Sequence, residues 1–407
     1  MSFGEKMNDR DLSVFVHEYV HFLQDITTLY GLEGISSDFG TLTNMVSWVK
    51  SNKHSPIYVP LPETILDEIT KNNRFISDST WGESGELNNI EIIDINIDSS
   101  ISIAVDDYRT VESVIIKYKT NESEEGICSF GAREIYEGMA YLIEQHITKD
   151  FESSPDLPYN TALKVLERLY PILASDYKNI LILCDLALMS SNPGVEYVRM
   201  IGWIKENNFV PNNSAELFAF MEEKWETHDI NAEAKRIDFL IEKVEEVRAN
   251  MHSVLKNDAF FADFHNWVDT IFDNAIELRR RWPLFWLYIV EDGYVKDNPS
   301  FQTIYRLIGA PLVETAKHEY FFIPPEGCED STCLVYFKVF NQIYTLLVEG
   351  NLRCNLMPWC NNPNNLVEVD SSCHKCPWNH SPKDGYLCTF CGIWQHCGLN
   401  GIDIRKG

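Results

Sequence analysis

The sequence predicts an α+β fold that is predominantly helical and contains a small antiparallel sheet. Polar and apolar residues alternate through 90–105 and part of 111–119, as in half-buried strands, and a short strand is expected at 126–130. Residues 158–310 read mostly as helices that prolines interrupt. Seven of the eleven cysteines lie between residues 354 and 397, so that a cysteine-rich segment follows the predicted strands and helices.

The N-terminal segment predicts a mostly buried helix with one polar stripe. Residues 14–30 contain neither glycine nor proline, Asn8 or Asp9 can cap the start, and Gly31 is a candidate C-cap. Apolar side chains cover most of the helix surface. The polar positions fall close to a single stripe: Ser13, His17, Glu18, His21, Gln24, Asp25 and Thr28. A buried polar stripe needs partners, and a metal ion would supply one.

This stripe carries an HExxH motif, His17-Glu18-Tyr19-Val20-His21. On a helix, the four-residue spacing puts both imidazoles on one face, one turn apart, which suits a zinc ion. Glu18 can then act as general base toward a water on the metal. Asp25, one turn beyond His21, is positioned to orient a zinc-bound imidazole.

Residues 133–146 form a second helical pattern with one apolar and one polar face. The polar face carries Glu134, Glu137, Tyr141 and Glu144. Gly138 and Ala140 are small, which allows another helix to approach closely. Since an interior glycine costs about 1 kcal/mol relative to alanine, close approach explains the presence of Gly138.

Together the two segments, residues 9–31 and about 127–147, resemble the gluzincin type of zincin metallopeptidases. The resemblance rests on HExxH and on a segment of the form Glu-Gly-x-Ala-x-x-x-Glu that begins at Glu137. It implies that Glu137 is the third zinc ligand and Glu144 an acid behind the ligands, with Glu134 as the alternative ligand. Asp38, in a segment that reads as a loop, is another possible oxygen ligand.

The resemblance also implies a domain order and an activity. We expect a zincin-like catalytic core at 1–150, a helical lobe at 151–320 and a cysteine-rich, zinc-ribbon-like segment at 321–407. An edge strand is expected to line the substrate cleft. The helical lobe either completes the catalytic domain or forms a separate recognition module.

The predicted function is an intracellular zinc metallopeptidase. Glu18 takes the proton of the attacking water and passes it to the leaving amine. The ion and one further donor, for which Tyr141 is the candidate, stabilise the oxyanion. Two alternatives remain open, a non-catalytic, zinc-stabilised interaction scaffold and a zinc hydrolase that acts on a non-peptide bond.

The cysteines predict structural zinc in addition. Two CxxC pairs, Cys373 with Cys376 and Cys388 with Cys391, can supply four thiolates to one tetrahedral ion. A second set is available nearby, formed by Cys354, Cys360, His396 and Cys397, with His374 and His380 as alternatives. The expected cofactors are therefore one catalytic and one or two structural zinc ions.

Composition limits the partners of this 407-residue chain. Its net charge of −27 argues against a nucleic-acid binder, because phosphate contacts require a basic face. It has no apolar run of membrane-spanning length, and its N-terminus has no signal-peptide core. We expect a cytoplasmic protein with a protein or peptide substrate and no membrane association. The short basic run at 279–281 is expected at a helix end.

Overall fold

The structure is a computed structural model of the 407-residue chain. It describes residues 7–83, 85–103, 109–151, 153–228, 235–255, 259–314, 320–328, 334–361, 369–380 and 387–407. The chain forms two compact units. The first comprises Met1–Ile35, Asn72–Val247 and Phe272–Tyr305, and the second Ser36–Lys71, Arg248–Ile271 and Arg306–Gly407. The division into consecutive segments at 1–150, 151–320 and 321–407 stays a prediction.

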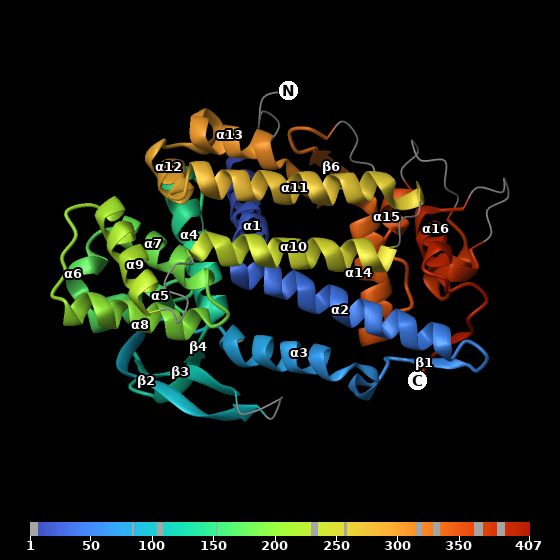
Figure 1. The fold of residues 1–407 in the computed structure, drawn as a ribbon, viewed down its shortest axis with the longest axis horizontal. Helices are drawn as coiled ribbons and strands as arrows, with labels where there is room; N and C mark the ends of the chain where they lie inside the picture. Colours follow the sequence, from blue (N-terminus) through green and yellow to red (C-terminus); the bar gives the residue numbers. More distant parts are fainter. Residues whose placement is uncertain are drawn as a thin grey trace. The chain divides into compact units, whose positions relative to one another are not determined.

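The coarse part of the expected fold class, a predominantly helical α+β fold, is confirmed, since the described residues are mainly helical and include a small antiparallel sheet (Figure 1). That sheet has the order β2-β3-β4, with β2 at Ile90–Ile103, β3 at Arg109–Thr120 and β4 at Glu125–Phe130. Strands β2 and β3 lie where the alternation of side chains predicts them, and β4 covers the short strand expected at 126–130; residues 104 and 105 of the first predicted range lie outside the described residues. Gly131 connects β4 directly to α4 (Ala132–Ile147), which carries the second predicted motif.

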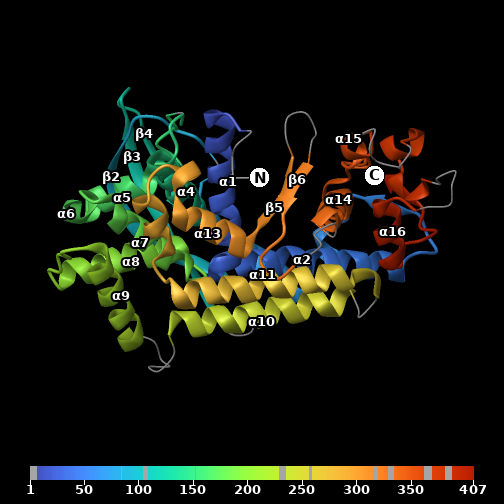
Figure 2. The ribbon, with the colours of Figure 1, turned by 90° about the horizontal axis from the view of Figure 1, so that it is seen from above.

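The first helix, α1 (Asp9–Thr27), packs against α4 in the first unit (Figures 1 and 2). Asn8 caps α1, because its Oδ1 accepts a hydrogen bond of 2.8 Å from the backbone N of Asp11. Most apolar side chains of α1 are buried, and its polar stripe faces α4. The sequence prediction of a buried helix with one polar stripe is therefore confirmed.

The predicted C-cap at Gly31 is wrong. Helix α1 ends at Thr27, and α2 (Leu29–Ser51) begins two residues later, so that Gly31 lies in its first turn. A Cβ at Gly31 would lie 2.4 Å from the Cα of Asp25. Glycine is therefore present because α2 starts in close contact with the end of α1, and this contact is a tertiary property that a local pattern does not encode.

Helices occupy most of the described part of the predicted helical region, 158–310, and α3 (Glu68–Trp81) precedes it. Those within the region are α5 (Thr161–Leu169), α6 (Pro171–Ala174), α7 (Tyr177–Leu188), α8 (Pro193–Glu206), α9 (Ser214–His228), α10 (Arg236–Leu255), α11 (Ala262–Arg281), α12 (Phe285–Glu291) and α13 (Pro299–Ile308). Helices α10 and α11 lie side by side in both views (Figures 1 and 2). Within the described part of the chain, no helix is both long and apolar enough to cross a bilayer.

A buried ion pair fixes the end of α1 in the first unit. Arg279 donates two hydrogen bonds of 2.7 Å to the carboxylate of Asp185, and its Nε donates to Thr27 O at 2.8 Å. Trp286 Nε1 also donates to Asp185, at 2.8 Å. The basic run does end a helix, as predicted, but its first member is buried and binds the free carbonyl at the C-terminus of α1.

The second unit contains the cysteine-rich segment and two small sheets. Strands β1 (Ile57–Val59) and β7 (Ile404–Lys406) pair in parallel, and β5 (Ala310–Glu314) pairs with β6 (Tyr320–Ile323) in antiparallel fashion. Helix α14 (Leu334–Glu349) packs against α16 (Thr389–His396). Short helical segments precede α16, namely α15 (Met357–Cys360), η4 (Ser371–His374) and η5 (Pro377–Asn379).

Candidate metal centre

Three side chains that the sequence singles out meet between α1 and α4. The Nε2 atoms of His17 and His21 lie 3.1 Å apart. Glu137 Oε2 lies 3.1 Å from His17 Nε2 and 3.5 Å from His21 Nε2. The two histidines lie one turn apart on α1, and Glu137 comes from the facing side of α4. These residues form one of the two groups of potential metal ligands among the described residues.

The spacing of these three atoms fits a single zinc ion. Zinc–ligand bonds of about 2.0–2.1 Å in a tetrahedron place ligand atoms roughly 3.3–3.4 Å from one another. The three observed separations are 3.1, 3.1 and 3.5 Å. Two imidazoles and a glutamate are also a donor set typical of catalytic zinc, in which the fourth position remains available to water.

The outer nitrogen of each histidine is held by a separate acceptor. His17 Nδ1 lies 3.0 Å from Glu144 Oε2, and His21 Nδ1 lies 2.8 Å from Gln24 Oε1. Ser13 donates a 2.5 Å hydrogen bond to the other oxygen of Glu144. If each Nδ1 donates its proton outward, both Nε2 lone pairs point to the shared centre, as metal-bound histidines require.

Gln24 corrects one expectation about this arrangement. Its Oε1 contacts His21, and its Nε2 donates to Tyr136 O on α4 at 3.2 Å. Gln24 is fully buried, whereas Asp25, which the sequence suggests for this role, is exposed. The prediction for Asp25 is wrong because Gln24 holds the outer nitrogen of His21, while the side chain of Asp25 is hydrogen-bonded to Tyr136 on α4. The expected position of Glu144 behind His17 agrees with the geometry.

Without a bound ion, a protonated His17 lies beside an ionised Glu137 at neutral pH. Burial on its own lowers the pKa of His17, but the hydrogen bonds and charges of Glu137 and Glu144 outweigh it and raise the pKa to about 9. Burial likewise raises the pKa of Glu137, but its hydrogen bonds to His17 and His21 prevail and lower the pKa to about 2. The carboxylate is therefore ionised and available to a cation across the physiological pH range.

The remaining member of the motif, Glu18, is open to solvent. It follows His17 directly on α1 and is exposed, while His17 and His21 are partly buried. An exposed acid beside a partly buried cation-binding group can exchange protons with water and with a bound substrate.

Three tyrosines lie near the centre, and one of them, Tyr136, is buried with its ring stacked on that of His21 at 6.0 Å between centroids. The Tyr141 side chain is buried, and its hydroxyl accepts a hydrogen bond of 3.2 Å from Ser154 N. The ring of Tyr159 lies 6.0 Å from the ring of His17 and 5.5 Å from that of Tyr141. A Cβ at Gly138 would lie 3.2 Å from Tyr159 O, so the small residue on α4 admits the segment that carries Tyr159.

Tyr159 was missed by sequence reasoning, which selected Tyr141 for its position one turn after Glu137. The signal that could have located Tyr159 is Gly138. The sequence predicts a close approach at this glycine, and the approaching segment includes residues 159 and 162.

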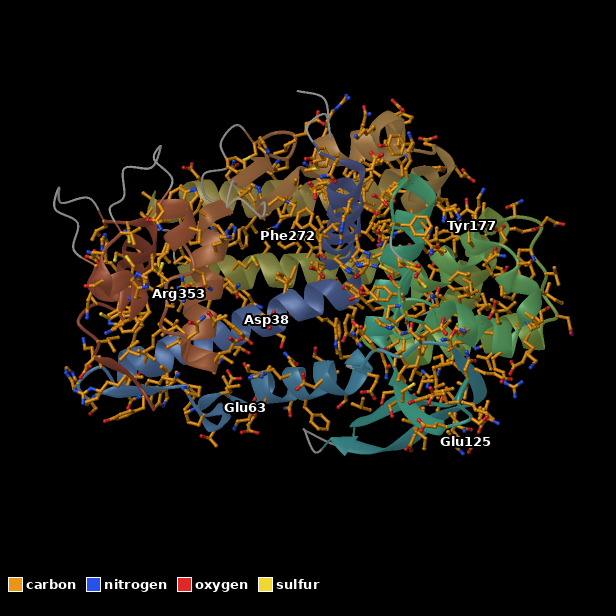
Figure 3. All side chains as sticks on the ribbon, turned by 180° about the vertical axis from the view of Figure 1, so that it is seen from behind. Asp38, Glu63, Glu125, Tyr177, Phe272 and Arg353 are labelled. Atoms are coloured by element: carbon orange, nitrogen blue, oxygen red, sulfur yellow. The ribbon has the colours of Figure 1, made fainter. Side chains whose placement is uncertain are left out.

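The two alternative third ligands lie elsewhere. Glu134 is fully buried and accepts hydrogen bonds from Gly131 N at 2.8 Å and Glu83 N at 3.2 Å, so it caps α4. Burial raises the pKa of Glu134 to about 7, despite these backbone hydrogen bonds. Asp38 lies within α2, and not in a loop as expected, in the part of that helix that belongs to the second unit (Figure 3).

The predicted double CxxC set is only partly brought together in the second unit. Cys373 and Cys388 line one small cavity, whose wall does not include Cys376. The thiol of Cys391 lies 3.2 Å from Pro377 O and also contacts Cys388. Hydrogen bonding by the side chain and the backbone N of Cys391 lowers the pKa of Cys388 to about 6. Cys388 and Cys391 therefore lie together as their spacing predicts, and the four-thiolate site with Cys373 and Cys376 stays a prediction.

The second predicted set is also divided. Cys354 and Cys360 line the same cavity as Cys373 and Cys388. His396 instead stacks on the ring of Phe260, with centroids 4.0 Å apart and planes inclined by 12°. Cys397 is the C-cap of α16. His380, considered as an alternative ligand, lies on the cavity wall, whereas His374 is exposed.

Comparison with known proteins gives no match: no family model fits the chain, and neither a curated protein nor a solved structure is significantly similar to it.

Proposed function

We propose that the first unit is a zinc-dependent metallopeptidase with His17, His21 and Glu137 as ligands. The observation that carries this proposal is the convergence of three donor atoms at separations of 3.1, 3.1 and 3.5 Å. Its support is the orientation of both imidazoles by Glu144 and Gln24, since a structural helix contact between histidines does not require that each outer nitrogen be held.

When bound, zinc supplies a Lewis acid that lowers the pKa of a water and polarises a carbonyl. Glu18 is the general base, because it is the exposed acid next to His17. It takes a proton from the attacking water and delivers it to the leaving amine. Glu144 and Gln24 keep the two imidazoles in the tautomer and orientation that this chemistry needs.

Tyr159 is the proposed donor to the oxyanion. Its ring neighbours that of His17, and it is partly exposed, whereas the hydroxyl of Tyr141 is occupied by Ser154 N. A phenolic donor aimed at developing negative charge contributes about 10²–10³ in rate in comparable sites.

The substrate class follows from β4. This strand pairs with β3 on one side, and within the described ranges no strand pairs with its other side. Its residue Ile127 is 64% exposed. An open strand edge can bind an extended peptide through main-chain hydrogen bonds. Glu137 is the sixth residue of the helix that follows β4, roughly 8 Å along its axis from the first.

The test is a comparison of wild type with Glu18→Gln and His21→Ala. Glu18→Gln is expected to keep its zinc and lose at least a thousandfold in turnover of a peptide library. His21→Ala is expected to lose one zinc ion per chain and all turnover. Glu167→Gln, an exposed acid on α5, is the matched control and should behave as wild type.

Two results would contradict the proposal. Full activity in Glu18→Gln would remove Glu18 from the reaction. A wild type that holds zinc at His21 but cleaves no peptide would leave the centre as a structural site or as that of a different hydrolase.

A further inference from the structure

A small cavity in the second unit is lined by four cysteines and one histidine. The cysteines are Cys354, Cys360, Cys373 and Cys388, and the histidine is His380. They come from separate short segments, around α15, η4, η5 and the start of α16. The remaining wall is mostly apolar and includes Leu356, Met357, Val369, Pro377 and Phe390.

Among the residues that line this cavity, His380 gives the clearest indication of a bound group. Its side chain is only 2% exposed, and its Nδ1 lies 3.0 Å from Asp370 Oδ2. The other ring nitrogen, Nε2, is buried and has no hydrogen-bond partner among the residues that the structure describes. A buried, unpaired nitrogen is costly, so an arrangement of this kind calls for a bound group.

The pairing of His380 with Asp370 is the arrangement that prepares a histidine to bind metal. A carboxylate that accepts the Nδ1 proton fixes the tautomer and leaves the Nε2 lone pair free. Asp370, Cys373 and His380 also form the second group of potential metal ligands among the described residues, in which Cys373 Sγ lies 3.8 Å from His380 Nδ1. The backbone N of Cys354 donates to Cys373 O at 2.9 Å, which holds two of the cysteines together.

We propose that this cavity holds one zinc ion, bound by the imidazole of His380 and by three of the thiols of Cys354, Cys360, Cys373 and Cys388. Soft sulfur and imidazole donors select zinc over magnesium or calcium, and three cysteines with one histidine are a standard structural set. The apolar wall leaves no open position for water, so this ion stabilises the second unit and takes no part in hydrolysis.

The proposal differs from the double CxxC arrangement in two residues that can be tested. Cys376 is not part of the cavity wall. Cys391 is also absent from that wall, although its thiol contacts Cys388 and lies 3.2 Å from Pro377 O. The proposed ligands are therefore taken from the cavity wall, and His380 provides the nitrogen donor.

The experiment is zinc counting by elemental analysis on the full-length protein. Wild type is expected to carry two ions per chain, and His380→Ala one. His374→Ala and Cys376→Ser are the matched controls, and each should keep both ions. His380→Cys should restore the second ion, because a thiolate can replace the imidazole as the fourth ligand.

Cobalt substitution gives a second readout, in a variant that leaves every residue of the cysteine-lined cavity unchanged. His21→Ala loaded with cobalt should show the intense absorption of a tetrahedral ion with thiolate-to-metal charge transfer. Loss of an ion in Cys376→Ser, retention of both in His380→Ala, or iron in place of zinc would overturn the proposal. Because His21→Ala removes only the ion at the first centre, failure of one proposal leaves the other measurable.

Discussion

Glu144 Oε2 lies 3.0 Å from His17 Nδ1, although 127 residues separate the two in sequence. The same carboxylate accepts a hydrogen bond from Ser13, one turn before His17 on α1. Glu144 therefore fixes the ring of His17 from behind while Glu137 approaches from the front.

Glu144→Gln is expected to weaken zinc binding at this centre by about 10- to 100-fold, since partners of metal-bound histidines contribute this much to affinity. The amide keeps the shape of the side chain but removes its charge. A competition titration with a zinc-sensitive chelator measures the effect, with Glu167→Gln as the control. An unchanged dissociation constant for zinc would show that the contact of Glu144 with His17 does not contribute to zinc affinity.

Tyr159→Phe is expected to lower kcat by about 10²–10³ with little change in KM, because the lost donor acts on charge that develops in the transition state. Tyr141→Phe should reduce kcat far less. Steady-state kinetics on one peptide substrate compare the two variants directly. A larger loss of kcat in Tyr141→Phe than in Tyr159→Phe would identify Tyr141 as the donor to the oxyanion.

The stability of the protein should depend on the ionisation of Glu134. Its pKa in the folded protein is raised from 4.5 to about 7, so the folded state holds this proton more tightly than the unfolded state does. The contribution of Glu134 to the free energy of unfolding is therefore fully present below pH 4.5. It is lost as pH rises through 7, and the loss amounts to about 3 kcal/mol. In Glu134→Gln this contribution is absent.

Urea unfolding at several pH values measures this effect. The stability of wild type minus that of Glu134→Gln should fall between pH 4.5 and 8, whatever constant offset the lost hydrogen bond adds. A difference that does not change with pH would mean that Glu134 ionises normally in the folded protein.

The buried pair of Arg279 and Asp185 should be sensitive to the loss of either partner. Arg279→Met leaves the carboxylate of Asp185 buried and leaves Thr27 O without its donor, which is expected to cost about 3–5 kcal/mol. Arg280→Met, at an exposed position on the same helix, is the control. Thermal unfolding of both variants gives the comparison, and equal midpoints would contradict the prediction.

Much of the fold was predictable because its signals are local. The alternation of side chains located β2 and β3, and the polar stripe of α1 identified the face that meets α4. Of the three carboxylates on α4, only Glu137 lies with both histidines, whereas Glu134 caps the helix. The polar face of α4 limits the candidates for the third ligand to these carboxylates, but the packing of α1 against α4 determines which of them lies beside both histidines.

The failures all involve contacts between one element and another, which a pattern within a single element does not encode. The start of α2 against Asp25 explains Gly31, and the approach of residues 159–162 to Gly138 determines which tyrosine neighbours His17. In the second unit, CxxC spacing favoured Cys376, but the folding of the short segments places His380 in the cavity with Cys373. Spacing identifies residues able to bind a metal, and only tertiary structure selects among them.

The distance of 120 residues between His17 and Glu137 has a consequence for synthesis. At about 5–20 residues per second, a growing chain exposes both imidazoles roughly 6–24 s before the carboxylate is added. During that interval the nascent polypeptide lacks its third ligand, so the proposed peptidase cannot act on neighbouring proteins while the ribosome is still making it.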